Sequence, residues 1–339
     1  MKDAHNYISK NLFYNGKDVL ITGGDGFIGK HLVEALHRSG ANITVLTRKN
    51  KSASKNMNVS YVHVDLTNFE QCKKKIPKTE IVFHLAGIAG GIKFNKKFQG
   101  SIFNQNTIIN SNILKLTSNY VKRFQFVSSV AVYPITKNYP LMEKDGMVGE
   151  PEPVNYGYGW SKRVGELQCK MFAEEFGIKM SIIRPDNTYG PFDNFDLKNA
   201  RIIPSLIRKV VEAKNKITVW GSGNQSRSFV YVDDLINGMI IGLSKYSKSE
   251  PINISSGVEI KIKEIIKKIV NISGKDLRIE YDTTKPEGMK RRVLSITKAK
   301  RDLKFKPKWS LQEGLTNTIK WYEKNRHIKN ADQLIERYL

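Results

Sequence analysis

Short apolar runs alternate with segments of helical spacing along the first half of the chain. Six runs rich in strand-forming residues stand at positions 18–22, 42–47, 59–64, 81–85, 124–128 and 180–184. Between them, apolar residues recur every three or four positions, most clearly at 28–36, 105–118 and 158–176. This alternation predicts an α/β protein with a doubly wound parallel (Rossmann) sheet, whose ligands lie at the carboxyl ends of the strands.

The pattern changes after residue 187, where the elements become shorter and loops separate them. Further elements are predicted at 194–214, 217–220, 232–243, 252–254, 262–272, 277–281, 297–302 and 311–325. We therefore predict an N-terminal extension at 1–16, a dinucleotide-binding Rossmann domain at 17–187, and mainly a smaller α/β substrate-binding lobe at 188–339. The part at about 225–257 is expected to return to the Rossmann domain.

Composition places the chain among ordinary globular proteins. Of its 339 residues, 40% are hydrophobic and 26% are charged. No apolar run approaches the roughly 18 residues of a membrane span, and the N-terminus lacks a signal-peptide core, so no membrane partner is expected. The two cysteines, Cys72 and Cys169, lack metal-ligand spacing. They predict a cytoplasmic protein with reduced thiols and no metal site.

The net charge of +24 is unusually basic. A nucleic-acid partner, attraction of small polyanionic ligands, or a lysine-rich solvated surface would each explain it. The basic residues are spread over the whole chain and form no single stripe interleaved with aromatics. This distribution favours the solvated surface, with attraction of small anions as a secondary effect, and makes nucleic acid an unexpected partner.

A glycine-rich turn follows the first predicted strand and precedes a helix. Strand, glycine turn and helix are the context that a dinucleotide-binding fingerprint requires, because the backbone there approaches a pyrophosphate at the helix N-terminus. We expect cofactor contacts from Gly23, Gly26, Phe27, Ile28 and Gly29.

The second predicted strand ends without the acidic residue that usually holds the ribose of NAD. Thr47, Arg48 and Lys49 stand there instead, and the two cations can bind a 2′-phosphate. The prediction is therefore NADP(H). The alternative is that these residues are ordinary loop cations and that the cofactor is NAD.

The ends of the next two strands supply further cofactor contacts. Asp65 and Leu66 follow the third strand, where an adenine edge would lie. Leu85, Ala86 and Gly87 end the fourth, where small residues let a cofactor lie against the backbone. The predicted cofactor contacts also include Asn106, Tyr158, Lys162 and Pro185.

Tyr158 and Lys162 are four positions apart, so they share one face of a helix. A phenol normally loses its proton near pH ~10, and a neighbouring cation lowers this pKa. Such a tyrosine can exchange a proton with an alcohol or a ketone near neutral pH. The spacing alone is common by chance, so the interpretation depends on the rest of the chain.

Several ordered motifs together resemble one family. The glycine turn, Ser129, Tyr158, Lys162 and the segment at 184–191 are similar to those of the extended short-chain dehydrogenase/reductases that act on nucleoside-diphosphate sugars. The resemblance spans about residues 17–325. It is nearest to the GDP-L-fucose synthase branch, through the stretches at 190–195, 219–223 and 282–286.

The resemblance implies roles for individual residues. Tyr158 would be the general acid/base, Lys162 would lower its pKa and bind the nicotinamide ribose, and Ser129 would hydrogen-bond the reacting sugar oxygen. The implied substrate contacts are Ser129, Asn187, Lys209, Trp220, Arg227 and Arg292. Trp220 would stack on the base, with core packing as the alternative. Lys290 and Arg291 are adjacent alternatives to Arg292.

Two departures narrow the chemistry. The fucose synthases epimerise with a Cys and a His, at positions where this chain has Ala131 and Arg201. Alanine has no titratable group and arginine stays protonated, so this epimerisation is not expected. The related 4,6-dehydratases place an Asp-Glu pair after the catalytic residue, whereas Val130 and Ala131 follow Ser129 here.

The predicted function is therefore hydride transfer between NADP(H) and C4 of a nucleoside-diphosphate sugar, with a GDP-sugar favoured. A 4-keto-sugar reductase is preferred, and a 4-epimerase with a tightly bound cofactor is the alternative. A non-catalytic nucleotide-sensing or RNA-binding protein on the same fold is the remote alternative. A homodimer is expected through helices near 106–118 and 161–176.

Overall fold

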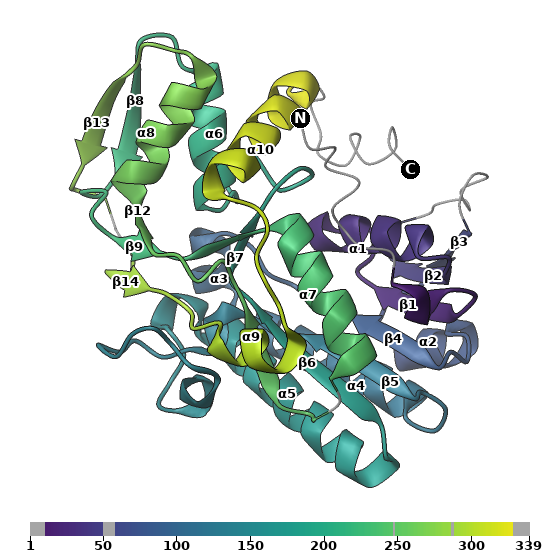
Figure 1. Ribbon diagram of the computed structural model, residues 1–339. Helices are drawn as coiled ribbons and strands as arrows, with labels where there is room; N and C mark the ends of the chain where they lie inside the picture. The colour runs from purple at the N-terminus through teal and green to yellow at the C-terminus, as the bar shows by residue number, and fades with distance from the viewer. Residues whose placement is uncertain (1–10, 50–57, 247, 286–287, 328–339) are drawn as a thin grey trace.

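A seven-stranded parallel sheet forms the centre of the molecule (Figure 1). The computed structural model describes residues 11–49, 58–246, 248–285 and 288–327. The strand order is β11-β6-β5-β4-β1-β2-β3. The bounds are β1 (Asp18–Thr22), β2 (Asn42–Thr47), β3 (Val59–His63), β4 (Ile81–His84), β5 (Arg123–Val127), β6 (Lys179–Pro185) and β11 (Pro251–Ile254). The predicted doubly wound α/β fold is confirmed.

Alternate residues of each strand enter two separate cores. Val19 and Ile21 of β1 belong to one hydrophobic cluster and Leu20 belongs to the other, as the two-residue period of a strand requires. On the first face the sheet is covered by α1 (Phe27–Arg38) and α7 (Val232–Lys245). The second face is covered by α2 (Phe69–Lys75), α4 (Gln99–Thr117) and α5 (Tyr156–Phe176).

The strand order places a topological switch beside β1. The chain leaves β1 outward through β2 and β3, and then returns to β4 on the other side of β1. Because the loops after β1 and β4 run in opposite directions, a crevice opens between the carboxyl ends of these two strands. The fold therefore directs the ligand to the glycine turn that follows β1.

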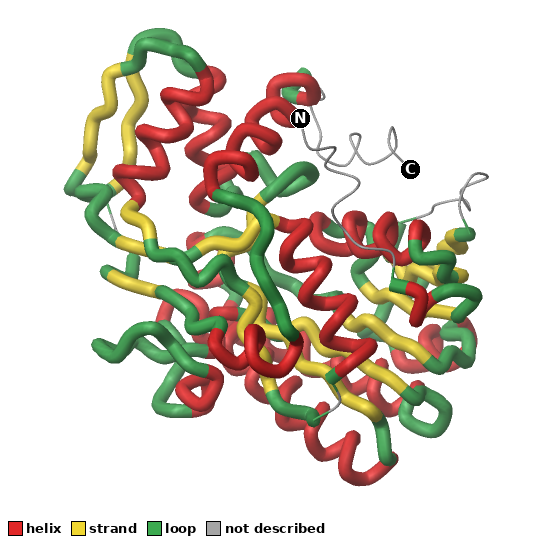
Figure 2. Tube along the Cα trace, viewed as in Figure 1, coloured by secondary structure: helices red, strands yellow, loops and turns green. Residues whose placement is uncertain are grey.

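A smaller lobe stands beyond these carboxyl ends (Figures 1 and 2). Its helices are α6 (Ile202–Glu212), α8 (Ile262–Ser273) and α10 (Leu311–Asn325), beside the parallel pair β8 (Lys216–Trp220) and β13 (Arg278–Asp282). Short strands connect it to the sheet: β7 (Asn187–Tyr189) with β10 (Phe229–Tyr231), and β12 (Ile260–Lys261), β9 (Ser226–Arg227) and β14 (Arg291–Arg292).

Segments from both ends of the chain join the Rossmann domain. Helix α7 and strand β11 return to the sheet from the second half of the chain. Helix α9 (Thr297–Leu303) also packs against β11 and α7, which the sequence pattern did not indicate. Within the predicted extension, Tyr14 is fully buried and its hydroxyl donates to the carbonyl of Ile240 at 2.9 Å. Residues 11–16 are thus part of the domain rather than an appendage.

Several short elements escaped the sequence pattern because they are too brief to show a period. They are α2, α3 (Ile92–Lys97), the two- and three-residue strands, and the 3-10 helices Leu12–Tyr14, Val130–Val132, Glu143–Met147 and Pro153–Asn155. Helix α4 begins at Gln99, earlier than the predicted 105.

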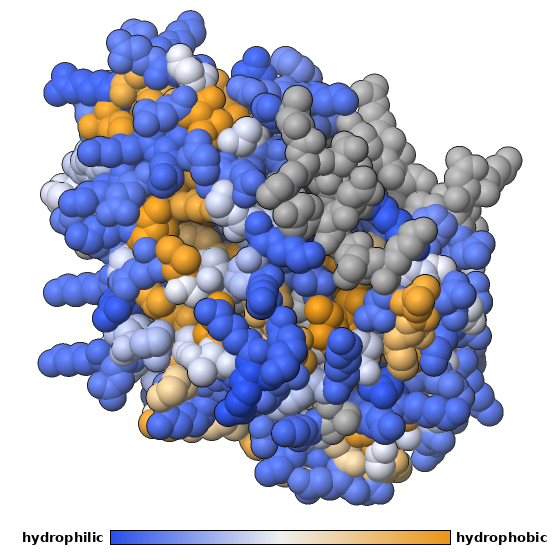
Figure 3. Space-filling view, viewed as in Figure 1, coloured by the Kyte–Doolittle hydropathy of each residue, from blue (hydrophilic) through white to orange (hydrophobic). Residues whose placement is uncertain are grey.

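Hydrophilic residues dominate the face seen in Figure 3, with apolar residues exposed in separate groups. Over the described residues, no helix has the length and apolar character to cross a bilayer.

A buried ion pair ties the sheet to α5. Arg184 of β6 donates to both carboxylate oxygens of Glu166, from Nε at 2.8 Å and from Nη2 at 2.6 Å. The Arg184 side chain is fully buried and that of Glu166 is 5% exposed. The hydroxyl of Ser128 also donates to Glu166, and Arg184 Nη1 donates to the hydroxyl of Tyr133 at 3.0 Å. Every charge in this cluster therefore has a partner.

Replacing Glu166→Gln should lower the free energy of unfolding by about 3–5 kcal/mol, because it leaves the Arg184 charge buried without its counter-ion. Urea denaturation of both proteins would measure the difference. Glu175→Gln, an exposed position on the same helix, is the control and should change stability by less than about 0.5 kcal/mol. Equal stability of the two variants would contradict the structural role of the pair.

Candidate active site

The glycine turn after β1 forms a cradle for a pyrophosphate. Gly23 has φ of +69°, and a Cβ there would lie 3.0 Å from the amide nitrogen of Ala86, at the end of β4. A Cβ on Gly29 would lie 2.1 Å from the carbonyl oxygen of Gly23. Gly26 precedes α1, whose first residues are Phe27 and Ile28. Only glycine fits at Gly23 and Gly29, and this close turn leads the backbone to the N-terminus of α1, where amides can face an anion.

A carboxylate reaches the end of β2 from this turn. The buried hydroxyl of Thr47 donates to Asp25 Oδ2 at 2.9 Å. Arg48 is exposed beside them, and its charge contributes to lowering the pKa of Asp65, after the hydrogen bonds from Thr67. The end of β2, where the cofactor ribose is expected, thus has both a carboxylate, Asp25, and a guanidinium, Arg48. Asp25 was not predicted, because it lies in the glycine turn, 22 positions before Thr47, and not at the end of β2.

The loop after β4 lies between the predicted cofactor residues and helix α5. A Cβ on Gly87 would lie 3.4 Å from Asn106 Oδ1 and 3.6 Å from Lys162 Nζ. Asn106 is buried and holds this loop, because its side chain bonds both the amide and the carbonyl of Ile88, at 2.6 and 3.0 Å. Three residues predicted from distant parts of the sequence are therefore neighbours.

The other predicted cofactor contacts lie at the same edge of the sheet. Asp65 is exposed after β3, and Leu66 is buried, with its carbonyl accepting from Asn112 at 2.9 Å. Leu85 directly follows β4, and Pro185 ends β6, paired in register with Ile254 of β11. All of them border the carboxyl ends of the strands.

Ser129 and Tyr158 form the centre of the candidate site. Ser129 caps the 3-10 helix after β5, and its hydroxyl accepts from the amide of Ala131 at 3.1 Å. Burial raises the pKa of the Tyr158 phenol, while a hydrogen-bonding contribution from Ser129 and the charge of Arg201 lower it in part. At neutral pH the phenol therefore holds its proton.

Lys162 lies beneath this pair. Its ammonium donates to the carbonyl of Val127 at 2.7 Å and lies 5.7 Å from the centre of the Tyr158 ring. Burial lowers the pKa of Lys162 to about 8, against the opposing charge of Glu166. The lysine was predicted to be the cation that lowers the tyrosine pKa. In the structure the cation that lowers the Tyr158 pKa is Arg201, and burial outweighs it, so the pKa is raised rather than lowered.

Arg201 connects three parts of the site. Its Nη2 donates to Asp193 Oδ1 at 2.8 Å, and its guanidinium lies 5.4 Å from the ring centre of Phe27 in the glycine turn. Asp193 is buried, and burial raises its pKa. Together with Ala131, which is also buried, Arg201 leaves these two positions without a group that titrates near neutral pH.

Two neighbouring arginines on the short strands β9 and β14 form a second part of the site. Arg227 of β9 and Arg292 of β14 are paired in register, and Arg292 Nη2 donates to Asn187 Oδ1 at 3.0 Å. Burial, followed by the charge of Arg292, lowers the pKa of Arg227 to about 10. The Nε atoms of both arginines are buried and lack a hydrogen-bond partner in the described part of the protein. Such a pair is suited to a diphosphate.

Trp220 and Lys209 stand apart from these residues. Trp220 is 49% exposed at the end of β8, so the alternative of core packing is wrong. Lys209 Nζ lies 5.8 Å from its ring centre and donates to the carbonyl of Thr218 at 3.0 Å. These contacts lie within the outer lobe, where an exposed ring is free to stack on a base.

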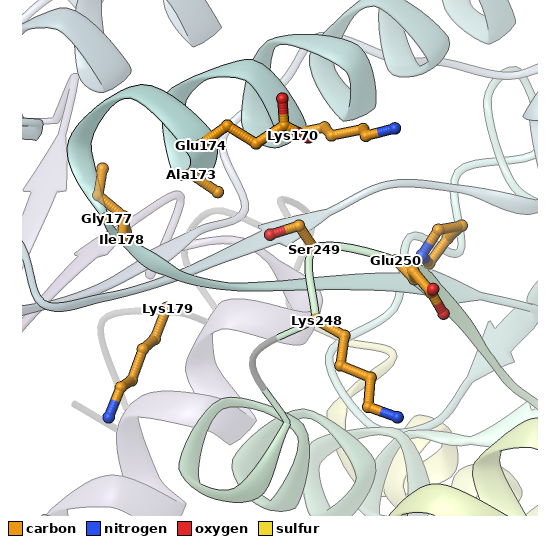
Figure 4. A pocket seen from close by; sticks show the side chains of 10 residues that line it. Lys170, Ala173, Glu174, Gly177, Ile178, Lys179, Lys248, Ser249 and Glu250 are labelled. Carbon is orange, nitrogen blue, oxygen red and sulfur yellow. The ribbon is translucent and has the colours of Figure 1, made fainter.

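A hollow in the surface lies elsewhere (Figure 4). It measures about 540 Å³ and is bordered by the end of α5, the start of β6 and the segment before β11, including Lys170, Glu174 and Lys248. It contains none of the predicted site residues. The described residues include no group of three or more His, Cys, Asp or Glu side chains placed to hold a metal.

The fold and the site define a dinucleotide-binding oxidoreductase of the Rossmann type with a Ser, Tyr and Lys set. Residues 19–255 match the NAD dependent epimerase/dehydratase family. Because this match covers well over half of the chain, the protein belongs to that family.

Individual relatives match this chain over nearly its whole length. The GDP-L-fucose synthase of Sinorhizobium fredii is 30% identical over 318 residues, covering 92% of this chain and 97% of the relative. A UDP-glucose 4-epimerase from Thermotoga maritima has a TM-score of 0.81 at 27% identity, covering 91% and 99% of the two chains. A GDP-mannoheptose C4 reductase from Campylobacter jejuni, with NADP bound, has a TM-score of 0.77 at 26% identity, covering 91% and 98%.

The charges at the end of β2 predict how the cofactor is selected. Asp25→Asn should raise the affinity for NADPH roughly 3- to 10-fold relative to NADH, because it removes a negative charge beside the 2′-phosphate. Arg48→Ala should change this ratio in the opposite direction. Nicotinamide fluorescence titrations would give both dissociation constants.

Asp18→Asn is the matched control, since Asp18 is exposed at the opposite end of β1. An unchanged NADPH-to-NADH ratio in the Asp25 variant would remove this residue from cofactor selection.

Proposed function

We propose that this protein reduces the 4-keto group of a nucleoside-diphosphate sugar with NADPH. The observation that carries the proposal is that Ser129, Tyr158 and Lys162 lie together, with the Lys162 ammonium 5.7 Å from the Tyr158 ring centre. These residues are the minimum required to move one proton at one carbinol carbon while a nicotinamide transfers the hydride.

The protonation state of the site supports the reductive direction. In a reduction, Tyr158 must give a proton to the carbonyl oxygen, and its raised pKa keeps that proton in place at neutral pH. Ser129 would hold the same oxygen by a second hydrogen bond. The charge of Arg201 would then stabilise the phenolate that proton donation leaves behind.

The cofactor and the nucleotide are inferred from charge and from relatives. Gly23, Gly29 and the N-terminus of α1 suit the pyrophosphate of a dinucleotide, and Arg48 suits a 2′-phosphate. The C4 reductase from Campylobacter jejuni holds NADP. That reductase and the fucose synthase both act on GDP-sugars by name, which favours GDP as the carrier. Arg227 and Arg292 would hold its diphosphate.

A 4-epimerase is the second candidate, and a specific observation favours it. Asp25 brings a carboxylate to the ribose end of the cofactor site, as an enzyme that retains NAD would have. The UDP-glucose 4-epimerase from Thermotoga maritima also has the same fold over most of its length. An epimerase would return the hydride to the sugar and consume no cofactor.

The decisive experiment mixes the purified protein with NADPH and GDP-, UDP-, CDP- and dTDP-linked 4-keto-6-deoxy sugars. We expect loss of absorbance at 340 nm with at least one of them, the GDP-sugar being favoured. Tyr158→Phe should slow this reaction by roughly 10²- to 10⁴-fold, because the proton donor is lost. Tyr156→Phe, on the same helix but with an exposed side chain, should react normally.

Absence of NADPH oxidation with every one of these sugars would end the reductase proposal. Conversion of a UDP- or GDP-hexose into its 4-epimer without added cofactor would establish the alternative.

The same proposal includes a homodimer in a reducing compartment. Helices α4 and α5 pack together on the outside of the sheet, yet each exposes large apolar side chains. Phe103 of α4 is 37% exposed, and Leu167 and Met171 of α5 are 42% and 61% exposed. A second copy of this pair of helices would cover them. The free, buried Cys72 and Cys169 support the cytoplasm as the location.

Met171→Glu should convert a dimer into a monomer, because it places a charge within the proposed interface. Light scattering coupled to size-exclusion chromatography would measure the mass. Val258→Glu, at an apolar position that is 66% exposed in the outer lobe, is the control and should leave the mass unchanged. A wild-type protein that is monomeric at micromolar concentration would refute the dimer.

A further inference from the structure

A carboxylate occupies the site of the two arginines. Glu152 Oε2 lies 3.5 Å from Arg292 Nη1, and its side chain is only 12% exposed. Its charge also raises the pKa of Arg227. Glu152 comes from the turn before α5, whereas the arginines come from β9 and β14 of the other half of the chain. No role follows for Glu152 from the family resemblance or from the catalytic residues.

The local charges explain why an acid is placed there. Arg227 and Arg292 repel each other, since the charge of Arg292 lowers the pKa of Arg227. The nearby carboxylate of Asp186 is itself held by the hydroxyls of Ser228 and Ser255 and by the amide of Asn187. Asp186 is therefore held in place by its own hydrogen bonds. Glu152, in contrast, reaches the arginines from the turn before α5.

Glu152 has a second partner within its own turn. Asn155 Nδ2 donates to Glu152 Oε2 at 3.0 Å, and Asn155 Oδ1 in turn accepts from Asn95 at 2.9 Å. The carboxylate can therefore give up Arg292 and keep a hydrogen bond. The bond to Asn155 is shorter than the 3.5 Å contact with Arg292. The contact with Arg292 is therefore the weaker one, and it is the one that a ligand would break.

We propose that Glu152 is a resident counter-ion of the anion site, which an incoming diphosphate displaces from Arg292. The inference rests on the proposed function, because it assumes that Arg227 and Arg292 receive the diphosphate of the sugar nucleotide. With Glu152 in place, the two arginines and the acid carry a net charge of +1. A phosphate group carries more negative charge than the single carboxylate that it replaces, since a phosphomonoester has roughly −1.5 to −2 at neutral pH. Displacing Glu152 costs each such ligand about the same free energy, so Glu152 weakens anion binding at this site.

The test compares nucleotide binding to the wild type, Glu152→Gln and Glu150→Gln by isothermal titration calorimetry, with GDP, UDP and GMP as probes. Glu150 is an exposed acid of the same loop, so its variant has the same net charge. Glu152→Gln should bind GDP, UDP and GMP roughly 3- to 10-fold more tightly, because no ligand then has to displace the carboxylate. Glu150→Gln should match the wild type within about twofold.

The melting temperatures of the proteins without nucleotide are an independent measurement. Glu152→Gln should melt at a lower temperature than the wild type without nucleotide, because the buried Arg227 and the partly buried Arg292 lose a counter-ion, and saturating GDP should remove most of this difference. Weaker GDP binding by Glu152→Gln would instead make Glu152 an acceptor for a ligand hydroxyl and overturn the proposal. Unchanged affinity would overturn it as well.

Arg292→Gln separates this inference from the proposed function. Loss of GDP binding in Arg292→Gln, together with no tightening in Glu152→Gln, refutes only the counter-ion. If Arg292→Gln is folded and binds GDP as well as the wild type, the diphosphate site is elsewhere and the proposed placement of the substrate fails too.

Discussion

The buried ion pair between Arg184 and Glu166 is the contact on which the arrangement of the site depends. It joins β6 to α5, and its hydrogen bonds to Ser128 and Tyr133 add the segment after β5. Ser129 directly follows Ser128, and Lys162 lies one helical turn before Glu166. The position of the proton-transfer group is therefore fixed by a charge pair behind it. Arg184 even requires Gly146, where a Cβ would lie 2.2 Å from Nη1.

The same pair sets the electrostatics of Lys162. Lys162 is buried, which lowers its pKa to about 8, and the charge of Glu166 keeps it from falling further. Because Glu166 is already shared with Arg184, it can support Lys162 only in part. The remaining positive charge near Tyr158 comes from Arg201, which Asp193 holds from the substrate lobe. The cation that acts on the phenol thus comes from the second half of the chain.

Sequence periodicity predicted the sheet because each strand of β1 to β6 is a separate apolar run with its own flanking helix. It also placed Ser129, Tyr158 and Lys162, whose neighbourhood follows from adjacent strand ends and one helix face. It could not place Asp25 or Glu152, since each acts on residues that are close only after the chain folds, and Arg201 was located only through the family resemblance. Tyr14 was missed for the same reason: its hydroxyl partner is in α7, at the other end of the sequence.

Asp25 and Glu152 share a physical logic. A chain with a net charge of +24 attracts polyanions without discrimination, so attraction alone cannot select a ligand. Selection requires a cost that the wrong ligand cannot offset. Each of these carboxylates imposes such a cost at a phosphate position, one beside the cofactor ribose and one beside the arginine pair. Basic residues draw nucleotides to the surface, and these two acids raise the affinity that an anion needs in order to be retained.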